Sequence, residues 1–379
     1  MLQIPLGYSG WQYFRDIRDA FDIQLADMAI KSKMPVKTPP VSLKILAEYL
    51  NLSPATVSLV MNNAPAVRSI PERTRQRVKE AAKKLNYRPN IVARSLRTRQ
   101  SFFIGILVPE PAEGYFPMIM KGIEQPLVQA GYFSFLVSHL WQQDLIEEYP
   151  QILLQRAVDG LVLINTPLLQ EISLPVVAIP GHKPMPGATN IVLDHEQATM
   201  LALQHLYDLG HRRIAFMKGP SFTQDVMARW SGTLLAAQRL GLPVLPELCM
   251  NFEASEMAPE MGYPIVRNLL SHTHDFTAIF CFNDTTAIGA IRAIRDAGLR
   301  CPEDISVVGF DDILSAAYHT PSLTTIRQPL RQMGETAAEV LLRRIKNPEE
   351  SHPGEIMLQP ELIVRESTSR ARELPAFVS

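Results

Sequence analysis

From residue 101 onward, the sequence alternates short apolar runs with stretches of helical periodicity. The apolar runs read FFIGILVP, FSFLVS, GLVLIN, PVVAI, RIAFMKG, AIFCFN, ISVVGF and LTTI. Apolar strands that alternate with helices are typical of parallel sheets covered by helices on both faces. Four of the expected helices end in a glycine suited to a left-handed cap, namely Gly131, Gly210, Gly241 and Gly298. About 270 residues of this pattern predict two α/β subdomains.

A different pattern lies upstream, in residues 41–63, which read VSLKILAEYLNLSPATVSLVMNN. Apolar residues recur there at helical spacing in two short stretches, Leu43, Ile45, Leu46 and Leu50, then Val57, Val60 and Met61. Ser53 followed by Pro54 marks a helix start, because serine is a good N-cap and proline suits the first helical position. Asn62 and Asn63 end the second stretch. We therefore predict a helix-turn-helix whose second helix lies in the major groove of DNA.

The charge distribution favours DNA binding over an ordinary helical hairpin. Residues 41–100 contain 12 basic and 3 acidic residues, although the formal charge of the whole chain is -1. Such asymmetry is typical of a module that neutralises phosphates. Pro71 and Glu72 mark the start of a third helix. Its expected inward stripe consists of Val78, Ala81, Ala82 and Leu85.

Several longer segments then carry a family resemblance. Residues 41–63, followed by ERTRQRVKEAAKKLNYRPNIVARSLRTRQSFFIGILVPE, resemble the head, hinge and first core strand of the lactose repressor (LacI) family of bacterial transcription regulators. HLYDLGHRRIAFMKGP, FNDTTAIGAIRAIRDAGL, CPEDISVVGFDD and PSLTTIRQP resemble that family's effector-binding core. The resemblance implies an α/β chain with an all-α helix-turn-helix head and a hinge helix. These would join a bilobed, doubly wound parallel-sheet core of the periplasmic sugar-binding type, with crossovers near residues 193 and 328.

We expect the domains to follow these patterns. They are a helix-turn-helix domain at 38–89, a hinge helix at 90–100, a bilobed effector-binding and dimerisation core at 101–368, and a tail at 369–379. Residues 1–37 precede the resemblance and lack sustained periodicity. They are either an N-terminal extension, as a disordered segment or an arm that touches DNA or a partner, or an artefact of start-site choice. Met34 lies close to where such heads usually begin.

The resemblance also implies which residues contact DNA. Hydroxyl side chains near the second helix suit phosphate contacts, whereas Pro54, Ala55 and Leu59 match positions that read bases. Many relatives carry arginine or histidine at the position of Leu59, but leucine offers only apolar contact to a thymine methyl, so we expect a different half-site base. In the hinge, Leu96 matches a residue wedged into the minor groove; a basic linker is the alternative. The full set is Ser42, Ser53, Pro54, Ala55, Thr56, Ser58, Leu59, Asn62, Arg94, Leu96 and Arg97.

Polar residues that follow apolar strands are candidates for ligand binding, because ligands in open α/β sheets bind outside the carboxyl ends of strands. By position or by resemblance, the effector-binding candidates are Glu113, Tyr115, Arg229, Phe252, Asn283, Asp311 and Gln328. An arginine, a carboxylate and amides around an aromatic face suit a sugar or another polyhydroxylated or anionic metabolite. The alternative for an Asp or Asn after a strand is a helix cap or turn residue.

The resemblance and the head together predict a DNA-binding repressor of carbohydrate metabolism, controlled by a small-molecule effector. We expect a homodimer on double-stranded operator DNA, since one head reads one half-site. A solute-binding carrier of the periplasmic type is the main alternative, but the basic head argues against it. We do not expect an enzyme, because no GxSxG, phosphate-cradling glycine loop or HExxH motif occurs.

The cysteines and histidines give no sign of a metal site or a disulfide framework. The three cysteines show no metal-ligand spacing and are too few for a disulfide framework, and the histidines are scattered. We therefore expect no metal and no cofactor. No apolar run approaches the roughly 18 residues needed to span a bilayer, and no secretory signal pattern is found, so we expect a cytoplasmic protein without membrane contact.

Overall fold

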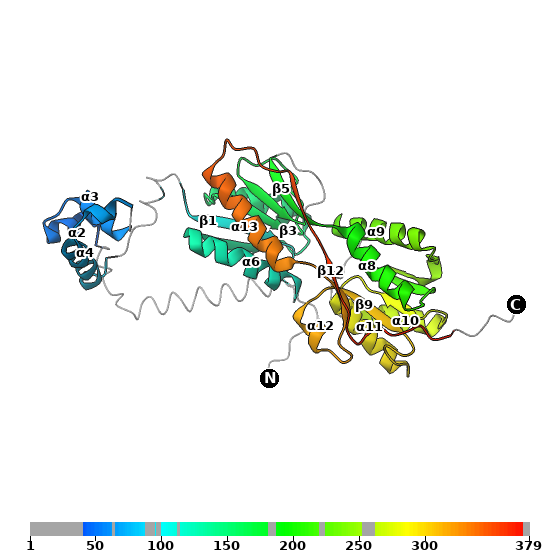
Figure 1. Ribbon diagram of the computed structural model, residues 1–379. Coiled ribbons are helices and arrows are strands. Elements are labelled where there is room, and N and C mark those ends of the chain that lie inside the picture. Colours follow the sequence, from blue (N-terminus) through cyan, green and yellow to red (C-terminus); the bar gives the residue numbers. More distant parts are fainter. Residues whose placement is uncertain are drawn as a thin grey trace, which may run out of the picture. The chain divides into compact units, whose positions relative to one another are not determined.

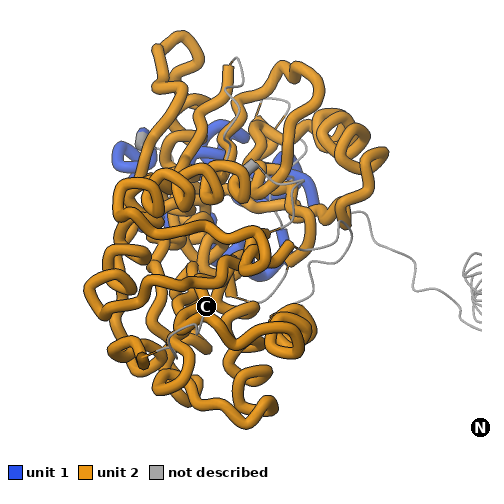
Figure 2. Tube along the Cα trace, turned by 90° about the vertical axis from the view of Figure 1, so that its right-hand side faces the viewer, with its two compact units in different colours: residues 1–94 blue, residues 95–379 orange. Residues whose placement is uncertain are grey.

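The computed structural model describes residues 41–62, 65–87, 95, 100–111, 114–180, 187–219, 224–251 and 262–373. The chain divides into two compact units, residues 1–94 and 95–379 (Figure 2). Within the described residues, no helix has the length and apolar character required to cross a membrane.

The first unit contains the predicted helix-turn-helix. Its helices are α2 (Leu43–Leu50), α3 (Pro54–Met61), the 3-10 helix η1 (Pro65–Ser69) and α4 (Glu72–Lys84). Ser53 Oγ accepts a hydrogen bond from the Thr56 amide at 3.1 Å and so caps α3. Asn51 ends α2 with a φ of 54°, a left-handed conformation that allows the tight turn.

The core of this unit joins the three α-helices. The buried side chains are Leu46, Ala47, Leu50, Val57, Val60, Val67, Val78, Ala81 and Ala82. The predicted inward stripe of α4 is confirmed, with Leu85 packed at its margin. Ile45, which the sequence placed in the apolar stripe of α2, is instead 49% exposed. The inner face of α2 is set by Leu46, Ala47 and Leu50, and Ile45 lies beside that stripe rather than on it.

In the second unit, the first lobe contains a six-stranded parallel sheet in the order β11-β5-β4-β3-β1-β2. Its strands are β1 (Phe103–Val108), β2 (Phe133–Ser138), β3 (Gly160–Ile164), β4 (Val176–Ile179), β5 (Ala188–Leu193) and β11 (Glu355–Leu358). Helices α6 (Tyr115–Ala130) and α13 (Leu330–Lys346) pack together over one face (Figure 1). Helix α7 (Gln143–Gln155) packs on the other face. Alternate side chains of β1 point to opposite faces of the sheet, so Ile106 packs in the core on one face and Leu107 in the core on the other.

The second lobe has the sheet order β12-β10-β9-β8-β6-β7, in which only β12 runs antiparallel to its neighbour. Its strands are β6 (Ile214–Lys218), β7 (Cys249–Asn251), β8 (Ala278–Phe280), β9 (Ser306–Asp311), β10 (Thr324–Arg327) and β12 (Glu361–Ile363). Its helices are α8 (His195–Asp208), α9 (Gln224–Leu240), α10 (Gly262–His272), α11 (Asp284–Asp296) and α12 (Leu314–Tyr318), with the 3-10 helix η2 (Pro246–Leu248). Helices α8 and α9 cover one face and α10 and α11 the other.

The chain passes between the lobes three times. It crosses from β5 to α8, from β10 to α13, and from β11 to β12. The two predicted crossovers near residues 193 and 328 are confirmed, and the third, at residues 359–360, was not predicted. All eight predicted strands are present, and the four predicted glycines have φ between 66° and 92°. The predicted bilobed, doubly wound core is therefore confirmed.

Two buried histidines predict that the core loses stability in mild acid. His211 Nε2 donates to the Ser369 carbonyl at 3.0 Å, and Nδ1 lies 2.8 Å from Thr277 Oγ1. Burial lowers the pKa of His211, and separately that of His139, from 6.5 to about 4. Because the folded pKa lies below the unfolded one, each neutral imidazole stabilises the fold above pH 6.5, and this contribution is lost as the pH falls toward 4.

We expect urea unfolding to show a fall in unfolding free energy between pH 7 and pH 4.5, on the order of 1–3 kcal/mol for each imidazole. His211→Gln should be less stable at pH 7 but show a flatter pH dependence. His272→Gln, at the exposed end of α10, is the matched control and should keep the slope of the parent. An unchanged slope in His211→Gln would contradict the assignment.

Candidate DNA-binding and effector-binding sites

The predicted base-reading residues lie on the outer side of α3. Pro54 and Ala55 are exposed in its first turn and Leu59 is half-buried, while Val57 and Val60 point into the core. The N-terminal turn of α3 therefore presents short side chains to the outside. This is the part of a recognition helix that contacts base edges.

The predicted hydroxyl and amide contacts also have roles within the head. Ser42 Oγ accepts from the Ile45 amide at 3.2 Å and caps α2. Ser53 Oγ lies 2.9 Å from Thr56 Oγ1. Asn62 Nδ2 donates to the Ser58 carbonyl at 2.8 Å and lies 3.1 Å from Ser58 Oγ. These bonds fix the ends of both helices, and phosphate contact by the same residues remains a prediction.

Five predicted site residues lie outside the described residues. They are Arg94, Leu96 and Arg97 of the expected hinge helix, together with Glu113 and Phe252. Their predicted roles stay as predictions.

The effector-binding candidates of the second lobe are organised around the side chain of Arg229, on α9. Its guanidinium carbon lies 3.6 Å from the centre of the Phe310 ring. One terminal nitrogen donates to Asp225 Oδ2 at 2.7 Å and the other to the Phe282 carbonyl at 2.5 Å. Arg229 is 6% exposed, so ion pairing, a carbonyl and cation–π contact replace the water that it loses.

A second pair of polar groups is formed by Asp311 and Gln328. Gln328 Nε2 donates to Asp311 Oδ1 at 2.6 Å, and both side chains are buried. Burial raises the pKa of Asp311 to about 7, although Arg229 and the Gln328 hydrogen bond oppose the shift. Asp311 also has a φ of 115°, which is strained for a residue with a side chain and is a conformation found at functional sites.

Tyr115 is the predicted effector-binding residue of the first lobe that lies near Arg229 and Asp311. It begins α6, and its pKa is raised well above the usual value by burial and by the nearby Asp225 and Asp311 carboxylates, while Arg229 opposes the shift. Gly114, directly before Tyr115, lies against the second lobe, because a Cβ there would lie 2.6 Å from the Ile313 side chain. The predicted residues Tyr115, Arg229, Asp311 and Gln328 therefore lie near the boundary between the two lobes.

Asn283 fits the helix-cap alternative. Its side-chain oxygen accepts from the Thr286 amide at 2.9 Å and from Thr285 Oγ1 at 3.0 Å, forming a capping box at the start of α11. Contact between Asn283 and an effector remains a prediction.

Sequence reasoning missed two residues of the cluster, Asp225 and His195. Asp225 Oδ1 lies 2.5 Å from His195 Nε2, while its other oxygen holds Arg229. The four-residue spacing from Asp225 to Arg229 on a predicted helix was a usable signal for this ion pair. His195 is far away in sequence, and only the fold brings it to Asp225.

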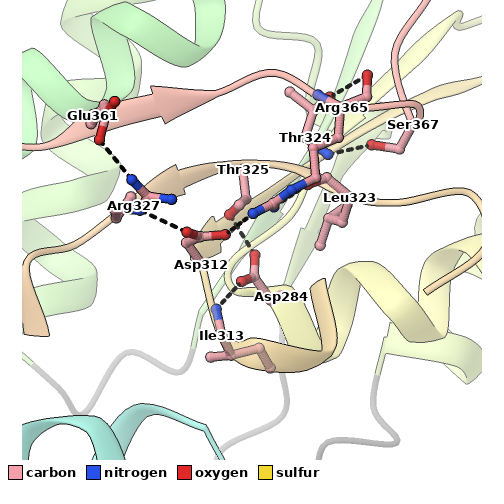
Figure 3. Close-up of polar contacts among 10 residues, drawn as sticks. All are labelled: Asp284, Asp312, Ile313, Leu323, Thr324, Thr325, Arg327, Glu361, Arg365 and Ser367. Carbon is pink, nitrogen blue, oxygen red and sulfur yellow. Dashed lines mark hydrogen bonds and ion pairs between the residues drawn. The ribbon is translucent and has the colours of Figure 1, made fainter. Parts of the chain in front are cut away.

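Asp312, the residue after Asp311, belongs to an ion network with Arg327, Glu361 and Arg365 (Figure 3). Asp312 accepts from Arg327 Nε at 2.7 Å and from an Arg365 nitrogen at 2.6 Å, and Arg327 also pairs with Glu361 at 2.9 Å. Arg327 ends β10 before the second crossover, and Glu361 begins β12 after the third. The network therefore ties two of the crossovers to the strand end that carries Asp311.

The fold and the site define a DNA-binding regulator with an effector core of the periplasmic-binding type, and comparison with known proteins agrees. Residues 42–90 match the family described as bacterial regulatory proteins, lacI family, and residues 203–368 match the periplasmic binding protein-like domain. The HTH-type transcriptional repressor PurR of Aliivibrio salmonicida is 34% identical over 340 residues, covering 87% of this chain and 99% of that protein. The chain belongs to the LacI family of bacterial transcriptional repressors.

Solved structures support the same assignment. The lac repressor dimer bound to operator and the anti-inducer ONPF superposes with a TM-score of 0.75 at 29% identity, covering 87% of this chain and 100% of that one. A complex of the transcriptional regulator CelR with cellobiose gives 0.63 at 29% identity and the same coverage. A LacI family regulator from Enterococcus faecium with bound ribose also gives 0.63 at 29%, over 71% of this chain and 100% of that one.

These findings confirm the predicted function at the level of the family. The chain is a transcriptional repressor with a DNA-binding helix-turn-helix and an effector-binding core. Its curated relatives are transcriptional regulators rather than enzymes.

Proposed function

We propose that the protein is a cytoplasmic, homodimeric repressor whose affinity for a palindromic operator is controlled by a sugar or related metabolite, which it binds without turnover. The observation that carries the effector site is the convergence of Tyr115 from the first lobe with Arg229 and Asp311 from the second. Ribose and cellobiose are the bound molecules in two of the similar structures. Stacking, charged and amide groups around one site suit such polyhydroxylated ligands.

Control of DNA binding follows from where the effector sits. A ligand held between the lobes binds one lobe arrangement more tightly than the other, and it shifts operator affinity only by that difference. Asp311 is joined to the second crossover through Gln328, and its neighbour Asp312 is joined to the same crossover through Arg327. Rearrangement of Asp311 on ligand binding is therefore transmitted to the segments that set the lobe angle.

Exposed apolar side chains on both lobes support the homodimer. On the edge strand β2, Phe133 is 62%, Phe135 42% and Leu136 44% exposed, and on α12 Leu314 is 74% and Tyr318 80% exposed. Exposed apolar side chains that gather on one element are common at protein interfaces. We propose that β2 and α12 contact their counterparts in a second copy, which places two heads on the two halves of one operator.

Substitution of Leu59 is expected to change the base that the protein selects in each operator half-site. Leu59→Arg would place a guanidinium on the outer side of α3, where it can bind guanine O6 and N7 bidentately. Selection of random duplex DNA should then show a preference for guanine at one position of each half-site, with discrimination of about 1–3 kcal/mol. Leu59→Met retains an apolar side chain and is expected to leave the selected half-site unchanged. The same consensus in Leu59→Arg and the parent would remove Leu59 from the base-reading set.

The test of the function combines operator selection with effector response. The purified protein should enrich a palindrome from random duplex DNA at fixed salt, and Leu96→Ala should weaken that enrichment if the hinge residue contacts DNA. A protein-free metabolite extract of the source cells should then change the affinity for the selected operator by at least about tenfold, within the usual range of allosteric coupling. No enrichment with or without extract would contradict the proposed DNA-reading role. Enrichment without any response to extract would contradict effector control.

A further inference from the structure

We propose that Asp225 makes the effector site select uncharged polyhydroxylated molecules and reject anions. This inference rests on the proposed effector site and narrows the class of metabolite that it accepts. Asp225 is four residues before Arg229 on α9, and its carboxylate holds both the Arg229 guanidinium at 2.7 Å and His195 Nε2 at 2.5 Å.

The arginine of this site is already neutralised by the protein. An arginine that recognises an anionic ligand offers two parallel N–H groups to the ligand's oxygens. Here one terminal nitrogen is engaged by Asp225 and the other by the Phe282 carbonyl. Each terminal nitrogen keeps a second N–H, but a ligand carboxylate or phosphate would have to compete with the Asp225 carboxylate for the charge of the same guanidinium.

The carboxylates near Arg229 also disfavour an anionic ligand. The Asp225 and Asp311 carboxylates both raise the pKa of Tyr115, and Arg229 lowers it, so these three charged groups act on the same side chain. Asp225 forms the ion pair that balances the charge of Arg229, and Asp311 is a second carboxyl group close to the same guanidinium. The Arg229–Asp225 ion pair therefore has no net positive charge with which to attract an anion in this desolvated setting.

Ligand hydroxyl groups can hydrogen-bond both to Arg229 and to the nearby carboxylates. Arg229 Nε is buried and has no hydrogen-bond partner among the described residues. A ligand hydroxyl can accept from this N–H and at the same time donate to an Asp225 or Asp311 oxygen, because a hydroxyl is both donor and acceptor. A fully ionised carboxylate or phosphate has no proton to donate and would face the two carboxylates instead.

The test uses the full-length protein on its selected operator, with the metabolite extract divided into fractions. An anion exchanger at pH 7.5 separates the extract into an unretained fraction and a retained, anionic fraction. The parent protein should respond to the unretained fraction only. Asp225→Asn keeps an oxygen that can hold Arg229 but removes the charge, and it should gain a response to the retained fraction on the order of tenfold in operator affinity. Asp208→Asn, an exposed site on α8, should behave as the parent.

Each result has a distinct meaning. A parent response to the retained fraction, or the same charge preference in Asp225→Asn as in the parent, would overturn the inference while leaving effector control intact. Operator binding that responds to neither fraction would overturn effector control itself, and the inference with it. Circular dichroism and the unfolding midpoint of Asp225→Asn verify that the variant is folded when it is assayed.

Discussion

Replacement of Arg229 with methionine is expected to abolish effector control and to destabilise the core. The guanidinium pairs with Asp225, binds the Phe282 carbonyl and stacks on Phe310, all with 6% exposure. Removing one partner of a buried ion pair leaves an uncompensated charge and typically costs about 3–5 kcal/mol. Loss of charged hydrogen bonds to a ligand should lower effector affinity about 100-fold.

The expected loss of stability depends on pH. Arg229 lowers the pKa of Asp311, which burial has already raised to about 7. Without Arg229 that pKa rises further, so the Asp311 carboxyl takes up a proton near neutral pH and relieves part of the charge penalty. Urea unfolding should therefore show a smaller difference between Arg229→Met and the parent at pH 6 than at pH 8.

A control on the same helix separates this effect from a general loss of charge. Arg239, in the last turn of α9, is exposed and lies 3.9 Å from Glu196. Arg239→Met should change the unfolding free energy by less than about 0.5 kcal/mol, as expected for a surface ion pair, and should retain effector control. If both variants lose effector response equally, the assigned role of Arg229 is wrong.

The second large effect is expected at the contact between α6 and α13. A Cβ at Gly122 would lie 2.0 Å from the Arg331 carbonyl oxygen and 2.8 Å from the Glu335 nitrogen. A Cβ at Gly334 would lie 2.1 Å from the Ile119 carbonyl oxygen. The two helix backbones therefore touch at this point, and the obstructing atoms belong to main chains that cannot rotate away.

Gly122→Ala should lower the unfolding free energy by more than about 4 kcal/mol, because α6 and α13 must move apart and both pack on the first-lobe sheet. The gain of about 1 kcal/mol in helix propensity from alanine is outweighed. Chemical denaturation measures the effect. Gly354→Ala, where no atom lies within 4 Å of the added Cβ, should remain within about 0.5 kcal/mol of the parent. A stable Gly122→Ala protein would contradict the close helix contact.

The strands that sequence patterns missed lack a continuous apolar run, for two physical reasons. β5 includes the polar residues Thr189 and Asn190, whose burial depends on the strand's place between β4 and β11. β7, β11 and β12 are the outermost strands of their sheets. Edge strands are covered on fewer sides, so they need no continuous apolar run and give a weaker signal. The eight strands that were predicted are dominated by such runs.

The effector-binding candidates were found singly but not as a cluster. A polar residue after a strand is visible in the sequence, which is how Asp311 and Gln328 were chosen. That Gln328 donates to Asp311, and that Asn283 forms a capping box, are consequences of where β9 and β10 end and where α11 begins. Three elements far apart in sequence must be placed before such bonds can be assigned.

The sequence by itself determined the local features of this protein. Serine caps, glycine ends, helical stripes and apolar runs are encoded within a few residues, because they depend on backbone preference and side-chain periodicity. Only the tertiary structure decided the third crossover, the backbone contact at Gly122 and the joining of His195 to Asp225 and Arg229. These features depend on which distant segments are in contact. The charge balance of a buried site is set by those contacts, and no single stretch of the chain determines it.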